Sequence, residues 1–185
     1  MTQISAFKLR QTSHILSHGG VIAYPTEAVY GFGCDPLNEL AVETILDLKQ
    51  RPVEKGMILI AANLDQIKDY IDIDKTIRNR IAPTWPGPNT WILPAQKWVP
   101  DYLTGKHQSI AVRVTDHPVA AKICDYFGQP IISTSANPSG LKPPKTKLQL
   151  LKYFSKTGVF IVSGKVGGLE KPTTIRDGVT GKRLR

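Results

Sequence analysis

The sequence predicts an α/β fold in which helices flank one twisted, largely parallel or mixed sheet. Apolar runs of strand length alternate along the chain with segments whose apolar residues recur at helical spacing. Loops rich in glycine and proline separate these segments, and neither an internal repeat nor an interior linker is visible. Because 41% of the 185 residues are hydrophobic, the chain can build a substantial core. A single domain over residues 1–185 is therefore expected.

Helices are predicted where apolar residues recur every three or four positions, or where a capping residue precedes such a segment. The first helix ends at Gly19-Gly20, which is typical of a helix C-terminus. Asn38 can cap the second helix, and Pro118 is tolerated in the first turn of the fifth. In chain order, the predicted helices cover residues 7–18, 39–50, 63–70, 74–82, 117–127 and 147–154.

Strands are predicted where four or five mostly apolar residues follow one another between turn-forming residues. The first such run stops at Pro25, and the run over 57–61 is continuously apolar, as in a buried strand. In chain order, the predicted strands cover residues 21–24, 57–61, 90–94, 110–114, 130–133 and 159–162, with at least one more within 173–185.

The chain carries an excess of positive charge, with 24 Lys and Arg against 15 Asp and Glu. Such an excess favours nucleic acid, nucleotide phosphates or an anionic membrane as partner, although a basic soluble protein without such a partner is the alternative. Because no run of five basic residues occurs, a polybasic membrane anchor is not expected. A signal sequence and an apolar stretch of membrane-spanning length are also missing, so a soluble, cytoplasmic protein is predicted.

Several classes of site are excluded because their motifs are missing from the sequence. The two cysteines cannot build a disulfide scaffold or a four-cysteine metal site. His14 and His18 lie one helical turn apart, but no third ligand accompanies them, so no metal ligand is predicted. The phosphate-binding P-loop, the dinucleotide-binding G-x-G-x-x-G motif and the nucleophile motif G-x-S-x-G do not occur either.

Five polar loops rich in glycine and proline are candidate ligand sites. Ligands of open α/β sheets bind at the carboxyl ends of strands, and loops of this composition are well suited to face them. Each loop alone could be a simple turn, but five together favour a site. The loops cover residues 24–33, 49–55, 85–90, 133–140 and 171–177.

The side chains of these loops are suited to binding a polyanion. Lys49 and Arg51 end the second predicted helix, where they could merely complement the helix dipole. With Lys55 close by, we favour a phosphate ligand, since Arg offers a bidentate fork and Lys a point charge. Residues 133–137 add three hydroxyls and an amide. Glu27 is the only acid of the first loop, and we interpret it as a hydrogen-bond anchor rather than a general base.

Six stretches of the sequence, in this order, resemble the YrdC-type threonylcarbamoyl-AMP synthase family. The resemblance is closest to its short bacterial form, TsaC, and extends over residues 24–177. The matching stretches are YPTEAVYGFG, KQRPVEKGMILIA, WPGPNTW, SIAVRVTDHP, STSANPSG and PTTIRD.

This resemblance implies a twisted mixed sheet with a concave basic face and a nucleotidyl transfer reaction. L-threonine and bicarbonate or CO₂ would give an N-carboxylated threonine, whose carboxylate attacks the α-phosphate of ATP with loss of pyrophosphate. Mg²⁺ is expected to arrive on the ATP phosphates, because the sequence offers no acid cluster to hold it. The implied partners are tRNA or other RNA on the basic face and the proteins that transfer the threonylcarbamoyl group to tRNA.

The resemblance also implies roles for individual residues. Lys49 and Arg51 would be catalytic, and Arg113 would read the carboxylate of threonine. The nucleotide would be bound by Lys49, Arg51, Lys55, Ser109, Ser135, Asn137 and Arg185. The threonine site would consist of Tyr24, Thr26, Arg113, Ser133 and Thr173.

Two positions depart from the pattern of many relatives, which have Thr at Ala28 and Ser at Thr173. The first change removes a hydroxyl from the implied threonine pocket, and the second keeps one. An RNA-binding module is the competing interpretation, because the positive charge would suit an RNA backbone. The sequence lacks an aromatic RNA-binding motif, however, and backbone binding would leave the polar loops unexplained. A non-catalytic relative that keeps the fold is the third interpretation.

Overall fold

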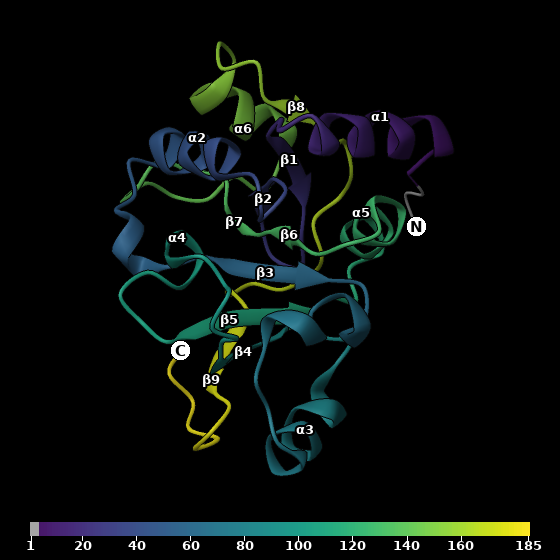
Figure 1. Cartoon of the computed structure of the whole chain (residues 1–185). Helices are drawn as coiled ribbons and strands as arrows, with labels where there is room; N and C mark the ends of the chain where they lie inside the picture. The colour runs from purple at the N-terminus through teal and green to yellow at the C-terminus, as the bar shows by residue number, and fades with distance from the viewer. Residues whose placement is uncertain (1–3) are drawn as a thin grey trace.

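The computed structural model describes residues 4–185 (Figure 1), and five of its six α-helices begin at a capping side chain. Asn38 accepts a hydrogen bond from the backbone N of Ala41, and His117 caps its helix as a helix-entry residue. The α-helices are α1 (Ala6–Ser17), α2 (Glu39–Lys49), α3 (Lys75–Ile81), α4 (Asp101–Thr104), α5 (Pro118–Phe127) and α6 (Lys147–Phe154). The single turns of 3₁₀-helix are η1 (Val53–Lys55), η2 (Leu64–Gln66), η3 (Lys68–Tyr70) and η4 (Ala82–Thr84).

The strands form two mixed sheets, which confirms the predicted α/β class but divides the strands in a way that was not predicted. The strands are β1 (Ile22–Pro25), β2 (Tyr30–Gly33), β3 (Ile58–Ala61), β4 (Asn89–Pro94), β5 (Ser109–Val114), β6 (Ile131–Ile132), β7 (Thr134–Ser135), β8 (Phe160–Ile161) and β9 (Thr174–Asp177). One sheet has the order β7-β2-β1-β8 and the other β6-β3-β5-β4-β9. Each contains parallel and antiparallel pairs.

The chain crosses from one sheet to the other at Ser133. The residues before it form β6 in the larger sheet, and the residues after it form β7 in the smaller one. The backbone N of Ser133 donates to the carbonyl of Ile58 at 2.7 Å, which fixes the crossing point against β3. In Figure 1, β1 and β2 run across the direction of β3 and β5. The segment around Ser133 connects the two sheets.

Apolar residues fill the space around both sheets. One buried cluster contains residues of both sheets, among them Phe32 of β2 and Val112 of β5. A second cluster lies where α1 and α5 pack side by side, and it includes Leu16, Ile60 and Ile123. The first cluster contains residues of both sheets, as a single domain would require. A single domain stays a prediction.

Two predictions of local structure were wrong. Residues 63–70 form two single 3₁₀ turns instead of one helix, with Asn63 capping only the first of them. Residues 30–33 were assigned to a loop because of their glycines, but they form β2. Gly33 serves close packing there, because a Cβ atom would lie 2.9 Å from the carbonyl oxygen of Ile132. A one-turn helix, α4, was not predicted.

Within residues 4–185, no helix combines the length and the apolar character that crossing a membrane requires.

Candidate active site

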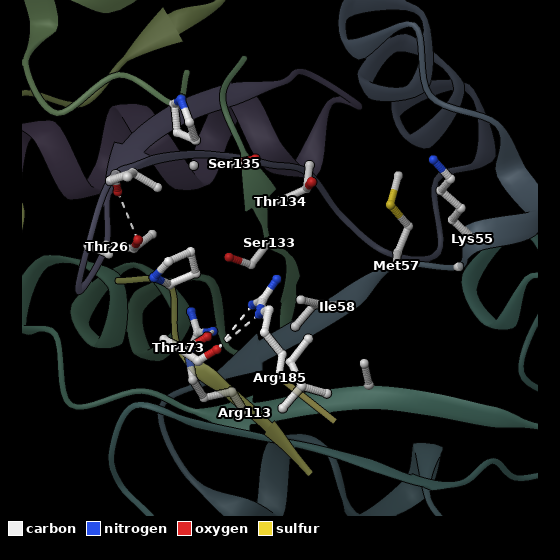
Figure 2. A pocket seen from close by; sticks show the side chains of 18 of the residues that line it. Thr26, Lys55, Met57, Ile58, Arg113, Ser133, Thr134, Ser135, Thr173 and Arg185 are labelled. Atoms are coloured by element: carbon white, nitrogen blue, oxygen red, sulfur yellow. Dashed lines mark hydrogen bonds between the residues drawn. The ribbon is translucent and has the colours of Figure 1, made fainter. Parts of the chain in front are cut away.

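A cavity of about 340 Å³ lies between the two sheets, beside the crossing point at Ser133. The smaller sheet contributes the turn between β1 and β2, and the larger sheet contributes residues of β3, β4, β5 and β9 (Figure 2). Along β5, residues 109, 111 and 113 share the face toward the cavity, because side chains alternate along a strand. The crossing segment adds the hydroxyls of Ser133, Thr134 and Ser135.

Positive charge dominates the walls of this cavity. Its cations are Arg51, Lys55, Arg113 and Arg185, and among the described residues that line it none has an acidic side chain. A cavity with this lining attracts anions.

Arg113 is buried in a cage of polar groups. Its Nη1 donates to the hydroxyls of Thr90 and Thr173, each at 3.2 Å. Its Nη2 lies 3.2 Å from Oε2 of Glu27, and this is the one buried ion pair in the part of the chain that the structure describes. The guanidinium is therefore oriented from two sides, and its charge is balanced by a nearby carboxylate.

Glu27 is the anchor that the sequence analysis favoured over a general base. Its Oε1 accepts a hydrogen bond of 2.6 Å from the hydroxyl of Thr115, and its Oε2 faces Arg113. The side chain is buried, and its backbone carbonyl accepts from the N–H of Leu169. These contacts tie the turn between β1 and β2 to the end of β5.

Arg51 reaches the cavity because α2 ends abruptly. Gln50 adopts a left-handed conformation at φ 50° and ψ 50°, and the backbone N of Arg51 donates to the carbonyl of Leu46. The guanidinium then donates to the carbonyls of Gly56 and Lys55 at 3.0 and 3.5 Å. Burial lowers the pKa of Arg51, yet its partners are neutral, so its charge remains unbalanced.

Lys49 joins the end of α2 to the crossing segment. Its Nζ donates to the carbonyl of Ser135, and to the carbonyl of Asn137 at 3.0 Å. The hydroxyl of Ser135 lies 3.4 Å away, and the backbone N of Ser139 donates to the carbonyl of Lys49. Burial, with a further contribution from the charge of Arg51, lowers the pKa of Lys49 to about 8. The structure thus brings the K-x-R and S-x-N segments together, with Lys49 supporting the loop.

Arg185 extends over the cavity from the segment that follows β9. Its Nε and Nη2 donate to the carbonyl of Thr173 at 3.4 and 3.1 Å. Figure 2 shows its side chain pointing toward Ser133. Burial lowers the pKa of Arg185, and the charge of Arg113 contributes to this shift.

The structure brings most of the predicted site residues to the cavity but not all. Tyr24 is fully buried, with no partner for its hydroxyl among the described protein groups, and burial raises its pKa. Asn137 donates to the carbonyls of Pro138 and Leu141, and its Oδ1 is buried without a partner. The predicted residues that line the cavity are Thr26, Arg51, Lys55, Arg113, Ser133, Ser135, Thr173 and Arg185. Those outside the lining are Tyr24, Lys49, Ser109 and Asn137.

Sequence reasoning missed the apolar part of the lining and the groups that hold Arg113. Ala28 lines the cavity, so the position that departs from the expected Thr faces the site. Because side chains alternate along a strand, Ala111 could have been predicted to share the face of Arg113 on β5. The same pattern does not show which residues of the neighbouring strands face the cavity. The missed apolar lining residues are Val29, Met57, Ile58, Ile92, Ala111, Pro143, Pro172 and Ile175.

No metal ligand was predicted, and the described residues contain no group of three or more His, Cys, Asp or Glu that could hold a metal ion. His14 and His18 are exposed on α1, as expected.

The chain that forms this cavity is similar to known proteins over nearly its whole length. The Sua5/YciO/YrdC family model, described as "Telomere recombination", matches residues 14–185. A threonylcarbamoyl-AMP synthase from Pseudomonas aeruginosa is 50% identical over 184 residues, which make up 98% of each chain. P. abyssi Sua5 complexed with L-threonine matches 95% of this chain with a TM-score of 0.87 and 30% identity, although the match spans only 52% of the Sua5 chain. E. coli YciO matches 94% of this chain and 84% of its own, with a TM-score of 0.84 and 28% identity.

Proposed function

The chain belongs to the Sua5/YciO/YrdC family, and we propose that it is a threonylcarbamoyl-AMP synthase. The observation that carries the proposal is a cavity lined by cations and hydroxyls, without an acidic side chain, in a chain that is similar over its whole length to a synthase of that name. The resemblance identified in the sequence is confirmed by the family model. A solved relative that binds L-threonine supports the amino acid as substrate.

In the proposed reaction, the neutral amino nitrogen of L-threonine forms a bond to the carbon of CO₂ and loses a proton to solvent, or reacts with bicarbonate with loss of water. An oxygen of the resulting carbamate attacks the α-phosphorus of ATP. The bond between this phosphorus and its bridging oxygen breaks, and pyrophosphate leaves with the electron pair. Negative charge accumulates on the phosphate oxygens, where cations and N–H donors stabilise it.

The cavity offers different groups to the two substrates. Arg51 and Lys55 lie at one side with no acid among the lining residues, which suits the polyphosphate of ATP. Arg113, in its cage of hydroxyls, suits the single carboxylate of threonine. Lys49, with its ammonium committed to loop carbonyls, would act on ATP by holding the Ser135 segment in place.

Mg²⁺ would enter bound to the phosphates of ATP. The hydroxyls of the crossing segment, with those of Thr26 and Thr173, are neutral oxygen donors in the cavity. Because the described lining residues include no acidic side chain, we propose that the protein contributes no charged side-chain ligand to the ion.

Pyrophosphate release tests the proposal directly. ATP, Mg²⁺ and bicarbonate are supplied with L-threonine, with L-serine, with L-valine or with no amino acid. Release is expected with threonine only when bicarbonate is present, and more weakly with serine, because one methyl group contributes about 10–200-fold in discrimination. Equal release with every amino acid, or release without any, would overturn the assignment.

The product would be an activated acyl-adenylate, which hydrolyses unless an acceptor takes the acyl group. We propose that the proteins which transfer the threonylcarbamoyl group to the adenosine beside the tRNA anticodon are the downstream partners. Binding of tRNA or other RNA by the basic surface should then fall steeply with salt, as backbone contacts do.

A further inference from the structure

We infer that Thr115 is a positioning residue that keeps Arg113 available to the carboxylate of the amino acid substrate. The inference rests on the proposed function, because it takes Arg113 as the group that binds this carboxylate. Thr115 follows β5 directly, is 2% exposed and does not belong to the cavity lining. It therefore acts on the substrate only through other residues.

The hydroxyl of Thr115 has one possible orientation. It lies 2.6 Å from Oε1 of Glu27 and 3.2 Å from the backbone N of His117. A carboxylate can only accept and a backbone N–H can only donate, so the hydroxyl proton must point to Glu27. The N–H of His117 in turn fixes the position of the hydroxyl oxygen.

This hydrogen bond determines how Glu27 meets Arg113. A carboxylate and a guanidinium commonly form two parallel hydrogen bonds, using both oxygens. Here Oε1 accepts from Thr115, and Oε2 lies 3.2 Å from Nη2 of Arg113 in an ion pair that lacks hydrogen-bond geometry. The Nε of Arg113 has no partner in the described chain. Glu27 thus balances the charge of Arg113 without occupying all of its donors.

Loss of the hydroxyl would change this balance. Oε1 of Glu27 would be left buried without a donor, which is costly for a charged oxygen. The nearest remedy is rotation of the carboxylate toward Arg113, which Thr90 and Thr173 hold in place through Nη1 and whose Nε is without a partner in the described chain. A two-oxygen pair between Glu27 and Arg113 would then compete with the substrate carboxylate for the same donors.

Three substitutions test the inference through steady-state kinetics of pyrophosphate release. Thr115→Ala and Thr115→Ser differ from each other by one hydroxyl, and Thr115→Val keeps the shape of the native side chain. In the Ala and Val variants the KM for threonine should rise about tenfold, the effect of one hydrogen bond to a charged group, while the KM for ATP changes less than about twofold. Thr115→Ser should retain values close to the native ones.

Thr12→Val is the matched control. Thr12 is a buried residue of α1 whose hydroxyl donates to the carbonyl of Lys8 at 2.7 Å, far from the cavity lining. It should alter thermal stability and neither KM value. Calorimetric titration with threonine gives a second readout that does not depend on turnover.

The outcomes separate the inference from the proposed function. Absence of threonine-dependent activity in the native protein overturns the function, and the inference with it. An active native protein with an unchanged KM for threonine in Thr115→Ala overturns the inference alone. So does a parallel rise of both KM values, or a Ser variant as defective as the Ala variant, since either would indicate a role in packing only.

Discussion

The cavity holds Arg113 in one way and the pair Arg51 and Lys49 in another, while Arg185 donates only to the carbonyl of Thr173. At the side of Thr173, Arg113 is buried against a carboxylate and two hydroxyls, so its charge is balanced and its orientation fixed. At the side of Lys55, Arg51 and Lys49 donate only to neutral oxygens of the loops around them. Figure 2 shows Thr173 and Lys55 on opposite sides of the cavity.

This difference indicates which ligand each side is built for. A balanced, fixed guanidinium suits one planar carboxylate, because little net charge has to be neutralised and geometry decides the affinity. Unbalanced cations suit a polyanion, whose own charge provides the missing counter-ion. The charge of Arg51 disfavours the protonated form of Lys49, and under the proposed function the phosphates of ATP would relieve this repulsion.

The largest expected effect comes from removing the counter-ion on the balanced side. Glu27→Gln leaves Arg113 buried without a carboxylate and should lower the free energy of unfolding by about 3–5 kcal/mol in denaturant titrations. The control is Asp65→Asn, which breaks the exposed pair with Lys68 and should have almost no effect. A similar small effect in both variants would show that Arg113 needs no counter-ion.

The next effect concerns pH and Lys49, whose pKa of about 8 lies below its usual value of 10.5. The native state releases this proton at lower pH than the unfolded chain, so the unfolded state binds more protons between these values. Stability contributed by this group should therefore rise from pH 8 to pH 10.5, by about 3 kcal/mol. Lys49→Met should lack this rise when unfolding is measured across the same pH range, and a rise of equal size in the variant would contradict the assignment.

Arg51→Lys tests whether the ATP side needs a planar fork or only charge. If Arg51 binds phosphate through two donors, the affinity for ATP should fall about tenfold or more while the melting curve stays unchanged. Arg10→Lys, at an exposed position on α1, is the matched control. Full activity of Arg51→Lys would remove Arg51 from the set of phosphate ligands.

The smallest effect comes from the turn that separates the two residues of the K-x-R motif. Gln50 has a left-handed backbone, which costs a non-glycine residue about 1–2 kcal/mol. Gln50→Gly should raise the free energy of unfolding by about 0.5–1 kcal/mol after the entropy of glycine is included. Gln11→Gly, within α1, should lower it by about 1 kcal/mol. Thermal melting of both variants tests the opposite signs.

The sequence predicted the elements whose signals are local. The Asn38 cap, the end of α2 near Lys49 and the polar crossing segment were all visible as short patterns, and the structure brings the last two into contact. The K-x-R and S-x-N motifs could be related only through the family resemblance, because Lys49 lies 86 residues from Ser135 and 88 residues from Asn137 in the chain.

The rest depended on strand pairing that no local pattern encodes. Thr90 faces Arg113 because β4 and β5 pair in one register, and Thr115 meets Glu27 because the turn between β1 and β2 lies against the end of β5. Gly31 and Gly33 looked like loop residues, yet they serve the close approach of the β2 backbone to its neighbours. The division into two sheets also depends on strand pairing, and the cavity lies between these two sheets.

The crossing of the chain at Ser133 also bears on the order of folding events. Neither sheet alone contains the cavity, and the contacts that close it, from Glu27 to Thr115 and from Lys49 to Asn137, each span 88 residues. Long-range contacts form late, after the entropy of closing large loops has been overcome. Recovery of threonine or ATP binding during refolding should therefore coincide with the slowest recovery of native structure, so that ligand binding reports on completion of the whole fold.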